Sequence, residues 1–213
     1  MKEMNTEMLA FLRQAVSARM SPKRLRHTLA VEEMAERLCA LYCPQHILAL
    51  RAAALLHDLT KELSLEEQVA LCRKYGLSVS DGDLLSPKTF HARTAAALIP
   101  DAFPQFATPT VINAVRWHTT GHAGMTLTEK LIYLADYIDL SRTYPACVFL
   151  RDTFFAKDVQ AMSGEERIRH LHDVLLLSYD LTLKDLIEEG APIAPDTVKA
   201  RNEILLLKNR SKL

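Results

Sequence analysis

The sequence lacks the features that mark nucleic-acid-binding, membrane-spanning and low-complexity proteins. Its 213 residues include 26 basic and 26 acidic side chains, and a chain without a basic excess is poorly suited to wrapping DNA or RNA. No apolar run approaches the roughly 20 residues that cross a bilayer, and the longest, Ile47–Leu56, is interrupted by Arg51. Only 6 glycines and 9 prolines are present, which excludes collagen-like and low-complexity chains. We therefore expect a globular protein that binds neither nucleic acid nor a membrane.

Cysteine is also scarce. The four thiols, at positions 39, 43, 72 and 147, form no C-x-x-C pair. Cys39 and Cys43 lie four residues apart, but no second pair follows at the spacing of a zinc site. The N-terminal segment contains acidic residues and lacks the apolar stretch of a signal peptide. The sequence therefore predicts a cytoplasmic protein with reduced thiols and no structural zinc.

The apolar residues recur at helical spacing. In the segment 127–138, leucine or isoleucine occupies every third or fourth position, which is typical of an amphipathic helix. Ser64, Thr126 and Ser163 are each followed three residues later by glutamate, the pattern of a helix-starting capping box. Alternating strand patterns and Asn-Gly hairpin turns are absent, and only the segment 77–86 is expected to be a loop. The sequence predicts an all-α single domain of eight to ten helices.

Four of the eight histidines lie on the apolar sides of four separate predicted helices: His27, His57, His91 and His118. Burying an imidazole without a partner costs about 1 to 3 kcal/mol, and a single such histidine is more often a satisfied core residue than a ligand. A metal ion can satisfy several imidazoles at once. Four on four helices therefore favour a metal site.

Two aspartates accompany these histidines. Asp58 directly follows His57, and Asp136 lies within the apolar run LIYLADYIDL; a buried carboxylate needs a cation, a hydrogen-bond donor or a metal. The His-Asp dipeptide alone is weak support, because a second copy occurs at His172-Asp173. The ordered set is stronger. Imidazole and carboxylate ligands suit iron, manganese or zinc, and six of them suit two ions about 3.5 to 4 Å apart.

The ordered set resembles the H…HD…D pattern of the HD-domain metal-dependent phosphohydrolases, with two further histidines as in the two-metal subgroup. The segments KRLRHTLAV, ALLHDLTKEL, RWHTTGHAGMTLTEKLIYLADYIDLSR and PDTVKARNEIL are, in this order, similar to the YqeK family of bacteria. The resemblance extends over roughly residues 20–207 and implies an all-helical HD fold. We expect an N-terminal helical extension in residues 1–20, the HD phosphohydrolase domain in 21–207, and a short, basic, frayed tail in 208–213.

The resemblance also implies an activity, the symmetrical hydrolysis of diadenosine tetraphosphate to two ADP at a two-iron centre. Manganese and cobalt remain alternatives, since they accept similar ligands. Asp58 would bridge the two ions, and His91 and His118 would hold the second. The metal ligands implied by the resemblance are His27, His57, Asp58, His91, His118 and Asp136.

The expected mechanism uses a hydroxide bridging the two metals. Two cations lower the pKa of a shared water, and charge developing on the phosphoryl oxygens requires fixed positive groups and donors. The expected catalytic residues are Asp58, Lys61 and Arg142. The expected substrate-binding residues are Arg24, Lys61, His91, Thr119, Thr120 and Arg142.

Two segments depart from the family pattern and leave questions open. After LADYI the chain has Asp139-Leu140-Ser141-Arg142, without the proline that is frequent there, so a ligand role for Asp139 is open. The loop 77–88 is longer and more polar than the usual helical link, so the preferred nucleotide is open. So are the role of Arg201 and the oligomeric state, a homodimer included. The alternative functions are an HD hydrolase for mono-, tri- or cyclic nucleotides and a non-catalytic nucleotide sensor.

Overall fold

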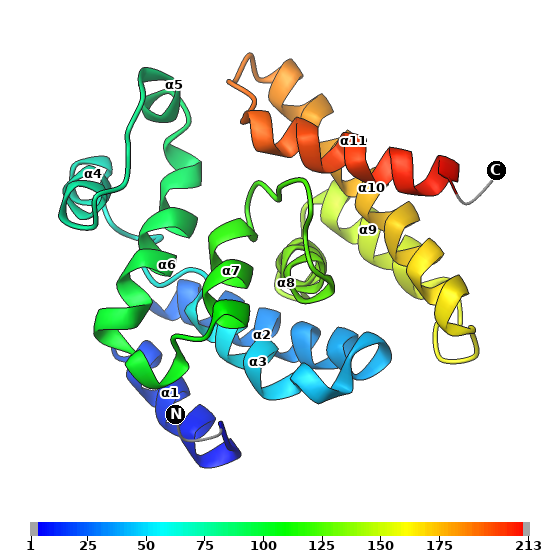
Figure 1. Cartoon of the computed structure of the whole chain (residues 1–213), viewed down its shortest axis with the longest axis horizontal. Helices are drawn as coiled ribbons and strands as arrows, with labels where there is room; N and C mark the ends of the chain where they lie inside the picture. Colours follow the sequence, from blue (N-terminus) through cyan, green and yellow to red (C-terminus); the bar gives the residue numbers. More distant parts are fainter. Residues whose placement is uncertain (1–3, 211–213) are drawn as a thin grey trace.

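The computed structural model describes residues 4–210, and within that range the protein contains helices and no strands (Figure 1). The prediction of an all-α fold is confirmed. The eleven α-helices are α1 (Thr6–Ser17), α2 (Pro22–Tyr42), α3 (Ile47–Leu56), α4 (Leu65–Lys74), α5 (Asp81–Leu84), α6 (Phe90–Ala102), α7 (Pro109–Trp117), α8 (Leu127–Ile138), α9 (Pro145–Phe155), α10 (Gly164–Glu188) and α11 (Pro195–Arg210). Three short 3-10 helices are η1 (Pro44–His46), η2 (Pro87–Thr89) and η3 (Pro104–Phe106).

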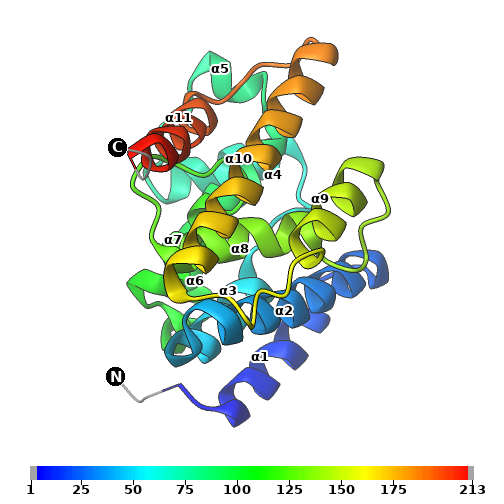
Figure 2. The same ribbon diagram turned by 90° about the vertical axis from the view of Figure 1, so that its right-hand side faces the viewer.

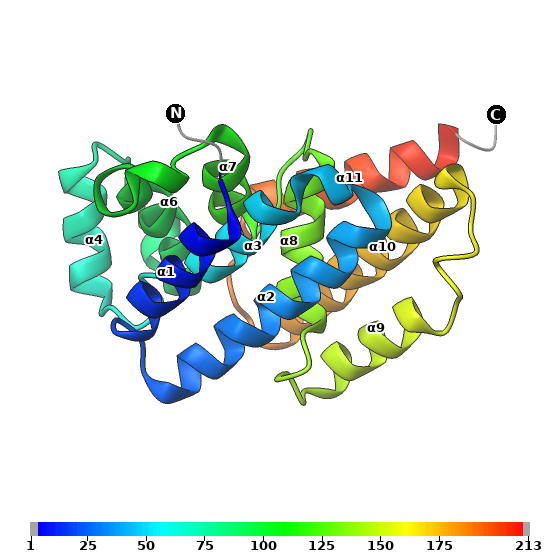
Figure 3. The same cartoon turned by 90° about the horizontal axis from the view of Figure 1, so that it is seen from below.

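Helix α3 forms the centre of the fold. It packs against α1, α2, α7 and α8, and Figure 3 shows it between α1 and α2. Its sequence is apolar on almost every side, as expected for a helix surrounded by protein. Leu50, Leu55 and Leu56 are fully buried, each contributing about 1.5 to 3 kcal/mol. The one charge, Arg51, reaches Glu32 and Glu36 on α2 with ion pairs of 3.0 and 3.2 Å.

The predicted capping boxes are present at the starts of α4, α8 and α10. In each, the hydroxyl oxygen of the capping residue (Ser64, Thr126 or Ser163) accepts a hydrogen bond from the backbone N–H three residues later. The glutamate at that later position accepts one from the backbone N–H of the capping residue. The segment predicted as a loop is only partly one. Ser80 caps the single turn of α5 by accepting from the backbone N–H of Asp83, so the prediction of a loop throughout 77–86 is wrong in its second half.

The C-terminal helices form a separate layer beside α8. The 25-residue α10 packs against α9 and α11 and touches α8, and Figure 2 shows it running along this side of the molecule. Because α11 continues to Arg210, residues 208–210 of the predicted tail are helical, while 211–213 lie outside the described residues. Within residues 4–210, no helix combines the length and the apolar character that crossing a bilayer requires.

Candidate metal centre

The six predicted ligands come from distant parts of the chain and meet where five helices end or begin. The local sequence explains this, because each ligand lies within two turns of a helix end, where side chains can point past the end of the helix. His57 and His118 directly follow α3 and α7, and their side chains are buried. The remaining four lie on α2 (His27), just after α3 (Asp58), on α6 (His91) and on α8 (Asp136).

Asp58 stands between two groups of histidines. Its Oδ2 atom lies 3.3 Å from His57 Nε2 and 3.6 Å from His27 Nε2. Its Oδ1 atom lies 3.2 Å from His91 Nε2 and 3.9 Å from His118 Nε2. One carboxylate therefore presents a separate oxygen to each group.

Two sets of three donors are close enough to surround a cation. Ligand atoms of His27, His57 and Asp136 lie within 4.8 Å of one another, and so do those of His57, Asp58 and His118. In the first set, Asp136 Oδ1 is 3.0 Å from His27 Nε2 and 3.8 Å from His57 Nε2. His91 joins the second set, because its Nε2 lies 3.0 Å from His118 Nε2.

The orientation of the imidazole rings also suits metal binding. The Nδ1 atoms of His57 and His118 lie 2.6 and 2.7 Å from the carbonyl oxygens of Ala54 and Val115. A carbonyl can only accept, so each Nδ1 carries the proton and each Nε2 is left as a free electron-pair donor. Anchoring of one ring nitrogen is the usual arrangement for a metal-binding histidine. The Nε2 atoms of His27 and His57 are buried and make no well-aligned hydrogen bond, although Asp136 Oδ1 and Asp58 Oδ2 lie 3.0 and 3.3 Å from them. A cation among these atoms would have both nitrogens and both oxygens as ligands.

Asp139 lies behind His27. Its buried carboxylate is 3.3 Å from His27 Nδ1, and the hydroxyl of Ser141 lies at 3.3 Å from the same nitrogen. The sequence left a ligand role for Asp139 open; the structure places it on the ring nitrogen that faces away from Asp136. The spacing of three residues from Asp136 could have indicated this, since both then lie on one side of a helix end.

The electrostatics of the centre favour anionic carboxylates. Burial opposes ionisation of Asp58, but His57 and His91 outweigh it and hold the pKa of the carboxyl well below its usual value. Burial likewise opposes ionisation of Asp136, and Arg142 and His27 keep its pKa low. Two ionised carboxylates in a buried site attract a cation.

The pKa values of the histidines in the centre shift in different directions, depending on the neighbouring side chains. Burial lowers the pKa of His91 and of His118, which keeps both rings in the neutral form that metals bind. Burial also acts to lower the pKa of His27, yet Asp136 and Asp139 outweigh it and raise this pKa to about 9. A cation at His27 Nε2 therefore has to displace a proton.

Three predicted cations surround the donors. Arg24 forms an ion pair with Asp58, and Arg142 Nη2 lies 2.5 Å from Asp136 Oδ1. The Lys61 ammonium lies 3.3 Å from both ring nitrogens of His91. Burial lowers the pKa of Lys61, against the opposing effect of Asp58. The structure thus brings all three positive groups to the centre.

The two predicted threonines occupy different places. Thr119 Oγ1 lies 3.2 Å from His91 Nε2 and 3.1 Å from His118 Nε2, so it belongs to the centre. Thr120 bonds the carbonyl of Gly121 at 3.0 Å and lines a neighbouring cavity instead. The turn depends on Gly121, whose φ is +62° and where a Cβ atom would overlap the hydroxyl of Tyr179 on α10.

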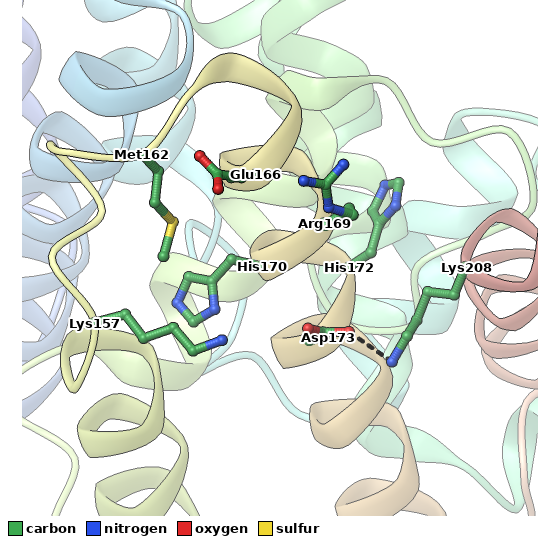
Figure 4. Close-up of a pocket in the computed structure, with 8 residues that line it drawn as sticks. All are labelled: Lys157, Met162, Glu166, Arg169, His170, His172, Asp173 and Lys208. Carbon is green, nitrogen blue, oxygen red and sulfur yellow. Dashed lines mark ion pairs between the residues drawn. The ribbon is translucent and has the colours of Figure 1, made fainter. Parts of the chain in front are cut away.

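Two further histidines, His170 and His172, line a separate cavity of about 460 Å³ that is formed by α10, the α9–α10 connection and Lys208 of α11 (Figure 4). It contains none of the predicted site residues. The charged segment EERIRHLHD predicts exposed histidines, but His170 is 3 % exposed and its Nε2 donates to the carbonyl of Phe154 at 2.9 Å. The prediction failed because α9, which covers His170, is distant in sequence.

Comparison with known proteins agrees with this geometry. Residues 24–141, more than half of the chain and including all six predicted ligands, match the family model described as HD domain. The chain belongs to the HD-domain family, and it is a hydrolase. The predicted resemblance and fold are thereby confirmed.

Three relatives carry the name "Bis(5'-nucleosyl)-tetraphosphatase, symmetrical". The protein of Halalkalibacterium halodurans is 31% identical over 193 residues, covering 91% of this chain and 95% of the relative. The Bacillus subtilis protein is 30% identical over 194 residues, covering 88% and 92%. The Staphylococcus aureus protein is 36% identical over 132 residues, covering 61% and 66%.

A solved structure from Clostridium acetobutylicum has the same fold. It is described as a predicted HD superfamily hydrolase involved in NAD metabolism, and it superposes with a TM-score of 0.80 at 28% identity. The superposition covers 97% of this chain and 100% of that one, so the C-terminal helices beyond the matched HD segment belong to the shared architecture.

Proposed function

We propose that this chain hydrolyses dinucleoside tetraphosphates symmetrically, and specifically diadenosine tetraphosphate to two ADP. The relatives' names supply the substrate class. The observation that carries the proposal is the placement of Asp58, whose two oxygens face different histidine groups. That arrangement suits two cations sharing one carboxylate, as in other sites that hydrolyse phosphoanhydrides.

The donor set fits two divalent cations, for which we propose iron, with manganese or cobalt as the alternatives. When bound, the cations supply a water of lowered pKa and positive charge for the phosphoryl oxygens. We assign His27, His57 and Asp136 to one cation and His91 and His118 to the other, with Asp58 shared. The buried Nε2 atoms of His27 and His57, which face carboxylate oxygens without well-aligned hydrogen bonds, support the assignment.

The residues around the donors bind and orient the polyphosphate. Lys61, Arg142 and Arg24 offer N–H donors beside the carboxylates and neutralise the charge that grows on the phosphoryl oxygens. Thr119 adds a hydroxyl donor next to His91, and His91 borders the substrate as well as holding a cation. Asp139 keeps the ring of His27 oriented through Nδ1.

The proposed cleavage requires no strong general acid, because the leaving group is stable without being protonated. The oxygen of one water joins the second or third phosphorus, and the central anhydride bond breaks. One ADP leaves as its phosphate oxyanion, a stable leaving group, and the water oxygen stays on the terminal phosphate of the other ADP. Both protons of the water pass to solvent as the two products ionise. We assign this chemistry to a catalytic domain of residues 21–207, with residues 1–20 as a helical extension and 208–213 as a tail.

Product analysis with diadenosine tetraphosphate tests the proposal. Metal-loaded protein is expected to yield ADP as the sole nucleotide product, two per substrate, by ion-exchange chromatography. Formation of AMP and ATP would contradict the symmetrical cleavage. Absence of turnover, with turnover of a mono-, tri- or cyclic nucleotide, would identify a different HD hydrolase, and tight ADP binding without any hydrolysis would identify a sensor.

A further inference from the structure

Two adjoining cavities lie next to the metal centre, between η2 and the connection from α10 to α11. Their volumes are about 240 and 340 Å³. They share a common wall, formed by Ser86, Thr89, Thr120, Pro192 and Ala194. The segment 77–88, where this sequence departs from the family pattern, supplies one side of both.

Thr119 stands between the smaller cavity and the metal centre. This residue lines the cavity, and its hydroxyl lies 3.2 and 3.1 Å from the Nε2 atoms of His91 and His118. A ligand whose phosphates occupy the centre therefore has this cavity as the adjacent space for the rest of the molecule.

The walls of the smaller cavity have the chemistry of a nucleoside site. Leu85, Pro87 and Leu186 present apolar surface to the cavity, and the 69% exposed side chain of Leu85 is available to pack against a ligand there. Hydroxyl groups of Thr89 and Thr182 lie among them. Mainly apolar walls with a few polar groups suit a flat heterocycle and its ribose, and the volume suits one nucleoside.

The larger cavity contains a guanidinium with free donors. Arg116 forms neither a hydrogen bond nor an ion pair with any residue in 4–210, although its guanidinium carbon lies 4.1 Å from the Trp117 ring centre. Its neighbour Arg93 is already used by Asp83, at 3.1 Å, and by the carbonyl of Ser78. Free N–H donors here can bind the ring nitrogens of adenine, which are hydrogen-bond acceptors.

We propose that these two cavities form the nucleoside-binding site of the substrate, with the ribose and base between η2 and residues 191–194 and Arg116 donating to the base. This rests on the proposed function only in that the ligand is a nucleotide with its phosphates at the metal centre. The segment 77–88 then determines which nucleosides this chain accepts.

Calorimetry with ADP and inorganic pyrophosphate on the metal-loaded protein tests the site. The two probes differ by the nucleoside, so wild-type protein is expected to bind ADP at least about tenfold more tightly. Ala194→Trp fills both cavities and should abolish this difference while pyrophosphate affinity stays. Val198→Trp is the matched control, since Val198 is four residues further on, in the first turn of α11, 38% exposed and outside both cavities; its ADP affinity should stay at the wild-type value.

Unchanged ADP affinity in Ala194→Trp would overturn the proposal, as would an equal loss for both probes in a protein that keeps its metal.

Arg116→Met retains packing on Trp117 and removes the donors. It should weaken ADP about three- to tenfold and leave pyrophosphate unaffected; an unchanged ADP affinity would remove Arg116 from the site. Because only binding is measured, failure to cleave diadenosine tetraphosphate would leave this result standing, and the reverse is equally true.

Discussion

The dipeptide His-Asp occurs twice in the chain and builds a site only once. His57-Asp58 follows the end of α3, both side chains are buried, and they approach Asp136 of α8 and His91 of α6, respectively. His172-Asp173 lies within α10, where Asp173 pairs with Lys208 at 2.6 Å (Figure 4). Consecutive residues inside a helix do not face each other, whereas beyond a helix end both can turn toward the interior. Position relative to the helix end thus distinguishes the two copies.

The strongest way to test this comparison is to remove each aspartate. Asp58→Ala should lose both metals and lower hydrolysis at least about 1,000-fold, because a shared anionic ligand is gone. The matched variant Asp173→Ala should keep both the metals and the activity, since its carboxylate is 49% exposed and its ion pair is with Lys208. Elemental analysis and the ADP-release assay measure the two effects. Retention of two metals per chain by Asp58→Ala would contradict its shared role.

The turn that follows Thr119 packs against α10, the helix that contains His172-Asp173, and a substitution of Gly121 tests this contact. Gly121→Ala should destabilise the protein by about 3 kcal/mol, because the new Cβ overlaps Tyr179 and the backbone φ is positive. Gly124→Ala is the control: its φ is +82° but no atom lies within 4 Å, so it should cost about 1 kcal/mol. Urea unfolding measures both. Equal losses would mean that the contact with α10 does not constrain the turn.

Replacing one arginine at the metal centre and one in the cavity around His170 should give a smaller difference in activity. Arg142→Ala should lower kcat/KM about 10- to 100-fold and keep the metal, because Arg142 contacts Asp136 and neutralises substrate charge. Arg169→Ala, in the cavity around His170, removes a 55% exposed side chain that pairs with the exposed Glu165 at 3.6 Å, and should leave kcat/KM unchanged. A loss of metal in Arg142→Ala would show that it maintains the ligands.

The smallest effect concerns His172 and pH. Burial and the neighbouring Lys130 lower its pKa from 6.5 to about 4, against Asp173 and Glu203, while Lys208 also lowers it. Between these values the unfolded chain binds a proton that the folded chain does not, so stability falls as pH drops from 6.5 toward 4. His172→Gln should remove roughly 1 kcal/mol of that loss, the half-buried ring being partly screened. Identical pH profiles of urea unfolding would contradict the lowered pKa.

Much of the fold and of the candidate site could be predicted from local sequence. Helix starts were visible because capping boxes such as Ser64 and Thr126 are determined within four residues. The six donors were visible because each interrupts an apolar pattern. Their meeting in space is observed, while their roles as ligands remain a proposal.

The features that escaped prediction depend on contacts between distant segments. The burial of His170 depends on Phe154, and the free donors of Arg116 depend on Arg93 taking Asp83. Asp139 was identified as unusual, but its position behind His27 required the two helices to be placed together. Spacing within one segment carries no information about such partners.

The contact between Gly121 and Tyr179 extends the catalytic unit beyond its donors. The HD match ends at residue 141, and every proposed ligand lies before that point. The turn that presents Thr119 is nevertheless shaped by a tyrosine 58 positions downstream of Gly121. A fragment truncated at the family boundary would retain all six proposed ligands and lose Tyr179, which packs against the turn after Thr119, so the C-terminal helices support the segment that carries the proposed substrate-binding threonine.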